Sequence, residues 1–125
     1  MTVFGKPHED ILAKSVTVKD ILTLKDNDLL NDSVINHYLE MIKERAEGDK
    51  KRYRSVYSFS SHLYPTLKDK GYSGVWRWTR KVDLFSFSLV LVPVHLPGGA
   101  GHWCLAVIDM EAKTIQYYDS IFRCS

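Results

Sequence analysis

The sequence predicts an α+β fold in which helices precede a sheet. Apolar residues recur at helical spacing in the first half of the chain, most clearly at Val34, Ile35, Tyr38, Leu39 and Ile42. A continuous apolar run at 89–96, LVLVPVHL, has strand length and suits a strand buried on both faces. Two more stretches of strand character follow this run, and helices followed by strands favour the α+β class.

Composition limits the function classes. A chain of 125 residues is enough for one domain with a modest core. Its 17 Lys and Arg against 15 Asp and Glu leave a net charge of +2, which indicates neither a nucleic-acid nor a membrane partner. The first ten residues have no apolar core of a signal peptide, and no apolar run approaches the roughly 20 residues of a membrane span.

The chain begins with a segment that has no pattern. Residues 1–15 are expected to form an N-terminal arm. Thr17 and Asp20 have the spacing of a capping box, in which each side chain accepts a hydrogen bond from the other residue's backbone. This pair predicts a short helix over 18–25.

The next elements follow from capping residues and apolar spacing. Asn31 or Asp32 can cap the second helix, and Gly48 ends it. A short strand is expected at 56–59, and a third helix at 61–70.

The last third of the chain is predicted to be β-structure. The glycine-rich turn 97–101 follows the apolar strand, and two further strands at 102–108 and 113–119 flank a loop at 109–112. A four-residue hairpin loop makes the two strands antiparallel neighbours, and loop length determines which residues face each other.

This register brings a histidine beside a carboxylate. If Ile108 faces Lys113, then His102 faces Asp119, with Cβ atoms about 4.5–5.5 Å apart. A carboxylate on one imidazole nitrogen fixes the tautomer and leaves the other nitrogen to act as a general base. One His opposite one Asp is also common as a plain surface or edge pair, so the pattern alone leaves both interpretations open.

The two cysteines, Cys104 and Cys124, are too few for a disulfide framework and lack zinc-site spacing, so no metal and no cofactor are expected. Cys104 lies two positions from His102, which separates their Cα atoms by about 6.7 Å. A Cys–His nucleophile pair needs roughly 2.6–3.2 Å. We therefore expect Cys104 to face Tyr117 and to pack as a small hydrophobic residue.

Six ordered stretches between Val16 and Ser120 carry a family resemblance. They are TVKDILTL (17–24), LLNDSVINHYL (29–39), KGYSGVWRWTRKVDLFS (70–86), LVLVPVHL (89–96), GHWCLAVIDM (101–110) and TIQYYDS (114–120). Together they resemble the catalytic domain of the SUMO-specific (sentrin-specific) proteases, which are ubiquitin-like-protein proteases of the papain-like cysteine peptidase type. The resemblance implies the N-terminal part of a papain-like fold, apparently truncated, over residues 16–125.

The resemblance also implies roles for five residues. His102 is similar to the family's general base and Asp119 to the acid that orients it. Trp103 resembles the aromatic residue that covers the diglycine tail of the substrate in a narrow tunnel. Asp32 and Arg77 resemble positions that contact the body of SUMO, with a helix cap and a surface charge as their alternative interpretations. The expected partners are SUMO and SUMO-conjugated proteins, without nucleic acid or membrane, for a monomer in the nucleus or cytoplasm.

Three departures from the family pattern qualify these expectations. Leu29 stands where the family usually has a tryptophan that forms the other tunnel wall. The turn 97–101 is longer than in the SUMO-directed branch. The family's nucleophile lies in an Asp-Cys-Gly segment with a preceding oxyanion glutamine, and the sequence contains neither; Cys124 lies in no such segment.

These observations predict a SUMO-specific cysteine protease that processes precursors after diglycine and cleaves isopeptide bonds to target lysines. The chain has a base and its orienting acid without the nucleophile segment, so the isolated chain is expected to be inactive. The alternatives are a non-catalytic pseudo-protease that binds SUMO, or a partial gene product that does not fold as written.

Overall fold

A four-stranded mixed sheet forms the centre of the fold. In the computed structural model, which describes residues 11–13, 16–25, 28–97 and 101–120, the strand order is β3-β4-β5-β6. Strand β3 (Val56–Ser58) runs parallel to β4 (Leu89–Leu96). Strands β5 (His102–Asp109) and β6 (Thr114–Asp119) complete the sheet as antiparallel neighbours. The predicted α+β class is confirmed.

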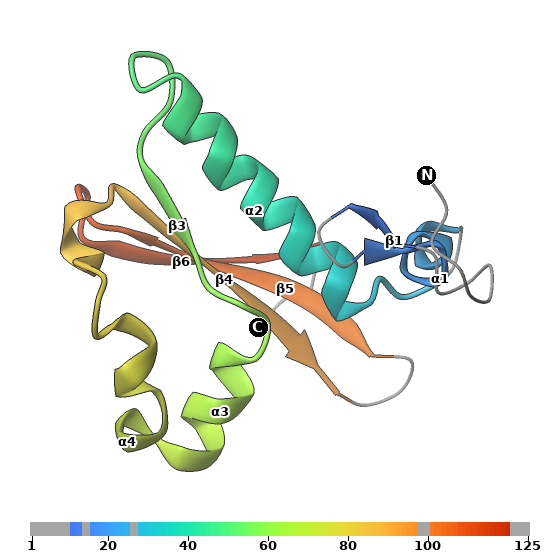
Figure 1. Ribbon diagram of the computed structural model, residues 1–125. Coiled ribbons are helices and arrows are strands. Elements are labelled where there is room, and N and C mark those ends of the chain that lie inside the picture. The colour runs from blue at the N-terminus through green and yellow to red at the C-terminus, as the bar shows by residue number, and fades with distance from the viewer. Residues whose placement is uncertain (1–10, 14–15, 26–27, 98–100, 121–125) are drawn as a thin grey trace.

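Helices cover both faces of this sheet. On one face, α2 (Asp32–Gly48) packs against β3 and β4 through Leu39 and Ala46. On the other face lie α3 (Leu63–Lys70) and α4 (Tyr72–Val75), on the opposite side of the strands from α2 (Figure 1). Because both faces are covered, β4 is continuously apolar from Leu89 to Val94 and does not alternate with polar residues there; the exposed His95 follows near its end.

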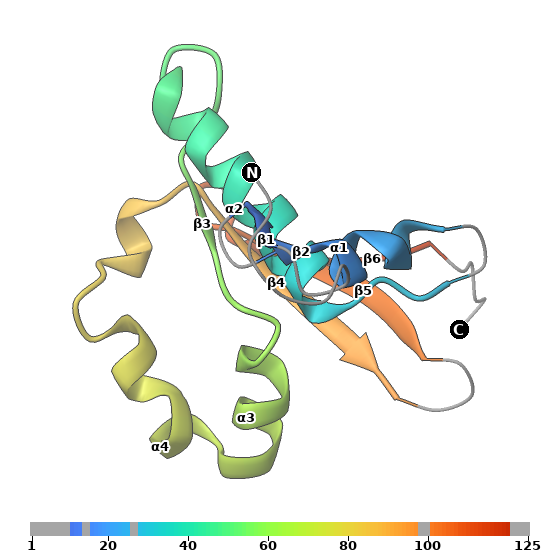
Figure 2. The same cartoon turned by 45° about the vertical axis from the view of Figure 1, so that its right-hand side comes forward.

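Short elements complete the described chain. Strand β1 (Ile11–Ala13), which lies within the predicted N-terminal arm, pairs with β2 (Val16–Thr17). Helix α1 (Val18–Ile21) and the 3₁₀ turn η2 (Leu22–Leu24) lie near the start of α2 (Figure 2). The remaining 3₁₀ turns are η3 (Trp76–Thr79) and η4 (Leu84–Ser86). Within the described ranges, no helix is long and apolar enough to cross a membrane.

The helix starts follow the predicted capping chemistry. The Thr17 hydroxyl accepts from the Asp20 N–H at 3.2 Å, and the Asp20 carboxylate accepts from the Thr17 N–H at 2.8 Å. Of the two candidates for the α2 cap, Asn31 takes the position, and its side-chain oxygen accepts from the Val34 N–H at 3.1 Å. Asp32 is the first residue of the helix.

The register of the β5–β6 hairpin differs from the predicted one by two residues. Ile108 pairs with Ile115 and not with Lys113, so the loop is 110–113. Asp119 consequently lies opposite Cys104, and the predicted direct pairing with His102 is wrong. A shift of two preserves the strand alternation, so His102 and Asp119 still project from the same face.

The side chain of Asp109 explains the shift. Its carboxylate accepts from the N–H groups of Glu111 and Ala112 at 3.1 and 2.9 Å, which places the turn after residue 109. Lys113 closes the turn with a left-handed backbone, at a φ of 58°. The guanidinium of Arg54 binds the same carboxylate through two hydrogen bonds, of 2.7 and 3.1 Å.

These contacts predict a pH dependence of stability. The Arg54 guanidinium, followed by the Ala112 N–H, lowers the pKa of Asp109 to about 2 from its usual 3.8. The ionised carboxylate is favoured in the folded state, so its stabilising effect is present above pH 3.8 and is lost as the pH falls toward 2. Urea unfolding of wild type and Asp109→Asn should differ at pH 7, and the difference should shrink below pH 3.8. A pH-independent difference would contradict this assignment.

Candidate functional site

A histidine and a carboxylate meet where β5 begins and β6 ends. The Nε2 atom of His102 lies 2.5 Å from Oδ1 of Asp119. Their side chains are 16% and 22% exposed, so the pair is largely shielded from water but open to a ligand. Since Cys104 occupies the position opposite Asp119, His102 reaches the carboxylate along the diagonal of the ladder. The predicted contact is therefore confirmed, through a different register.

This contact determines what the imidazole can do. In the neutral ring, the Nε2–H donates to Asp119, and the lone pair is on Nδ1. A carboxylate at this position also stabilises the imidazolium that forms when Nδ1 takes a proton. The pair therefore has the geometry of a general base held by an orienting acid.

Cys104 lies on the same face and close to the pair. The residue is 6% exposed, and ligand atoms of His102, Cys104 and Asp119 all lie within 4.8 Å of one another. The side-chain ligand atoms of His102 and Cys104 are therefore closer together than the Cα separation of about 6.7 Å expected for these two residues. A hydrogen bond to Cys104 raises the pKa of Tyr117 to about 12, and burial adds to the effect. Tyr117 lies opposite Ala106, so the predicted direct pairing of Cys104 with Tyr117 is wrong, and the two residues meet along the diagonal of the ladder through a polar contact.

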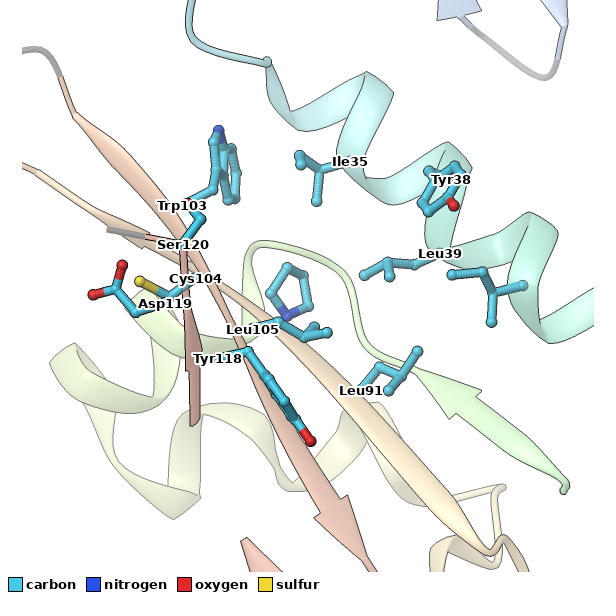
Figure 3. A pocket seen from close by; sticks show the side chains of 12 residues that line it. Ile35, Tyr38, Leu39, Leu91, Trp103, Cys104, Leu105, Tyr118, Asp119 and Ser120 are labelled. Atoms are coloured by element: carbon cyan, nitrogen blue, oxygen red, sulfur yellow. The ribbon is translucent and has the colours of Figure 1, made fainter. Parts of the chain in front are cut away.

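Trp103 points to the opposite face, toward α2. Its indole N–H donates to the Leu30 carbonyl at 2.5 Å, and its ring centroid lies 4.8 Å from that of His95. Figure 3 shows this indole on the same side of the strands as Ile35 and Tyr38 of α2. Together they line a hollow of about 490 Å³ between α2 and the sheet. An aromatic wall thus lies directly beside His102 in the chain.

The residue before His102 packs against the position where the family usually has tryptophan. Gly101 has a φ of +81°, and a Cβ added to it would lie 2.9 Å from Leu29 Cδ2 and 3.1 Å from His95 Nε2. The positive φ favours glycine, and a Cβ at this position would also require Leu29 and His95 to shift. Gly101 thus packs closely against Leu29 and His95 directly before β5 begins. Residues 98–100 of the preceding turn lie outside the described chain.

Asp32 and Arg77, the two predicted SUMO-contact residues, are both exposed. The carboxylate of Asp32 accepts from the Ser61 hydroxyl at 3.0 Å, which links the start of α2 to the segment before α3. The guanidinium of Arg77 lies 5.3 Å from the Trp76 ring centroid. Each side chain keeps an exposed polar group for a partner, and their SUMO contacts remain predictions.

Two features of the site escaped the sequence analysis. The proximity of Cys104 to His102 and Asp119 had a signal in the His-x-Cys spacing, since alternate residues of a strand project from one face. The hydrogen bond from Trp103 to Leu30 had no signal in the sequence, because it joins residues 73 positions apart.

Comparisons with known proteins agree on one family. The profile of the Ulp1 protease family, C-terminal catalytic domain, matches residues 28–125. The chain is 47% identical over 121 residues to a Sentrin-specific protease of Caenorhabditis elegans, and 42% identical over 119 residues to Sentrin-specific protease 2 of Mus musculus. These matches cover 94% and 92% of the chain but only 17% and 19% of the relatives.

Solved structures show the same fold. A SUMO protease Ulp1 with its catalytic cysteine oxidised to a sulfinic acid is 31% identical and superposes with a TM-score of 0.69, covering 89% of this chain and 48% of the other. The C-terminal Ulp1 protease domain in complex with Smt3, the yeast ortholog of SUMO, is 27% identical with a TM-score of 0.69. That match covers 100% of this chain and 51% of the other, so the chain spans about half of each solved domain.

The fit at Gly101 predicts a strong effect of one methyl group. Gly101→Ala should destabilise the protein by about 1–3 kcal/mol, because alanine is strained at a positive φ; its Cβ also requires Leu29 to move aside. Urea unfolding measures the change. Gly48→Ala is the matched control, since nothing lies within 4 Å of a Cβ there, and an equal loss in both variants would contradict the prediction.

Proposed function

The chain belongs to the Ulp1 protease family, and from this premise we propose that it provides the general base, its orienting acid and the SUMO-binding surface of a SUMO-specific cysteine protease. The contact of 2.5 Å between His102 and Asp119 is the observation that carries the proposal. Two observations support SUMO as the substrate. The relatives are Sentrin-specific proteases, and the solved Ulp1 domain is in complex with Smt3, the yeast ortholog of SUMO.

The geometry assigns each proton in the reaction. A cysteine thiol gives its proton to Nδ1 of His102, while Asp119 holds Nε2–H and stabilises the imidazolium. The thiolate attacks the carbonyl carbon of the last glycine of SUMO. The amine of the precursor peptide or of the target lysine leaves with the proton from Nδ1. Water then hydrolyses the thioester, and His102 again accepts and returns the proton.

Of the two cysteines, the structure describes Cys104, which is not placed to serve as that nucleophile. Cys104 is only 6% exposed, so its sulfur offers little surface to a bulky substrate carbonyl. Cys124 lies outside the described residues. The burial of Cys104 favours a second function, in which the chain holds SUMO without cutting it.

Binding of SUMO should depend on Arg77. We expect Arg77→Ala to weaken the binding of SUMO to the chain about tenfold, since it removes an exposed cation from the proposed contact surface. Isothermal titration calorimetry measures the affinity. Arg80→Ala, which removes a neighbouring exposed cation, is the control. Equal affinity of wild type and Arg77→Ala would place the contact surface elsewhere.

The role of His102 is tested by supplying the nucleophile. The chain alone should not hydrolyse a SUMO C-terminal fluorogenic amide. A chimera that carries residues 28–120 in place of the matching stretch of mouse Sentrin-specific protease 2 should hydrolyse it. In this chimera, His102→Ala should lower kcat/KM by about 100-fold or more, because the base is removed.

The matched control is His62→Ala, an exposed histidine at the start of α3, which should leave the rate unchanged. A chimera whose rate does not respond to His102→Ala would refute the assignment of the base. Hydrolysis by the chain alone, abolished by Cys104→Ser or Cys124→Ser, would show that one of these thiols is the nucleophile after all.

A further inference from the structure

Three different metal-binding groups gather on one face of the β5–β6 ladder. Within the part of the chain that the structure describes, His102, Cys104 and Asp119 form the one group of His, Cys, Asp and Glu side chains close enough to share an ion. They offer a nitrogen, a sulfur and an oxygen atom, all within 4.8 Å of one another. We propose that these three residues form a zinc-binding site that regulates the His102–Asp119 pair.

The ladder itself builds the site. His102 and Cys104 project from one face of β5 because they are two residues apart, and Asp119 lies directly opposite Cys104 on β6. Three ligands from two hydrogen-bonded strands are held in place by the backbone, so little chain entropy is lost on binding. The two-residue difference in hairpin register creates this arrangement, since it puts the carboxylate beside the thiol.

The chemistry of the ligands favours zinc. A tetrahedral zinc ion takes imidazole, thiolate and carboxylate ligands at about 2.0–2.3 Å, so its ligands lie roughly 3.3–3.8 Å apart. The His102–Asp119 contact of 2.5 Å must open by about 1 Å, and the widest separation must close by about as much. Side-chain rotation can provide both changes. Three protein ligands leave a fourth position for water.

The neighbouring groups support a bound thiolate. Tyr117 lies on the strand beside Cys104 and close to it, and a hydroxyl there can donate a hydrogen bond to the anionic sulfur that a metal requires. Zinc takes the thiolate of Cys104, and the thiol proton passes to solvent. The site is partly accessible through His102 and Asp119, whose side chains are 16% and 22% exposed.

Binding of zinc blocks the base, a consequence that rests on the proposed function. If zinc takes Nδ1, the lone pair that accepts the thiol proton is occupied. If zinc takes Nε2, the proton of the neutral ring must lie on Nδ1. In either case His102 cannot accept a proton, and zinc acts as a reversible inhibitor through a cysteine that is not the nucleophile.

Cobalt binding to the chain tests the site without any measurement of activity. One Co²⁺ per chain should produce the near-ultraviolet charge-transfer band of a thiolate-bound ion, and Zn²⁺ should displace it. Cys104→Ser should abolish the band, whereas Cys124→Ser, which removes the other cysteine, should retain it. Asp119→Asn should weaken binding about tenfold or more.

The far-ultraviolet circular dichroism of each variant confirms that it is folded. A folded wild-type chain without the band, or a band that disappears with Cys124→Ser, would overturn the proposal. Zinc inhibition of the SUMO protease chimera, relieved by Cys104→Ala, tests the regulatory role separately. If cobalt binds but the chimera is inactive without metal, the proposed function fails and the metal site stands.

Discussion

The burial of β4 on both faces is the constraint on which the rest of the structure depends. This strand pairs with β3 on one side and with β5 on the other, and its side chains enter both apolar clusters. Val90 and Pro93 are its most deeply buried residues. Helices cover both faces and hold β4 in place. Strand β5 pairs with β4 along its whole length, so β4 determines where β5 lies. The position of His102 at the start of β5 follows from this arrangement, through its pairing with Leu96 at the end of β4.

The local parts of the fold could be predicted from sequence because short-range chemistry determines them. The capping box of Thr17 and Asp20 and the apolar run of β4 depend on residues close to one another in the chain. The hairpin register could not be predicted, since it depends on the carboxylate of Asp109, which Arg54 holds from 55 positions away. Loop length alone does not determine the register when a distant side chain anchors the turn.

The contact between His102 and Asp119 forms although the observed hairpin register differs from the predicted one by two residues. Side chains of a strand alternate with a period of two, so a register error of two leaves every residue on its predicted face. An error of one would have put the carboxylate on the opposite side of the sheet. The consequence of the shift is the position of Cys104, which lies opposite Asp119 and beside His102. The Cα separation of about 6.7 Å between residues two apart on a strand therefore does not exclude Cys104 from the site, because both side chains project from one face.

The substitution of leucine for tryptophan at position 29 has a limited effect on the site. The other aromatic wall, Trp103, is held by a hydrogen bond to the backbone carbonyl of Leu30 and by the ring of His95, and neither contact depends on the side chain at 29. Leu29 instead fills the space above Gly101, which a Cβ at that residue would enter. A flat indole there could cover a peptide tail from the second side, whereas Leu29, at 39% exposure, offers a smaller apolar surface. The contact between His102 and Asp119 involves no atom of Leu29, so in the proposed function the residue at 29 bears on the enclosure of a peptide tail and not on the base.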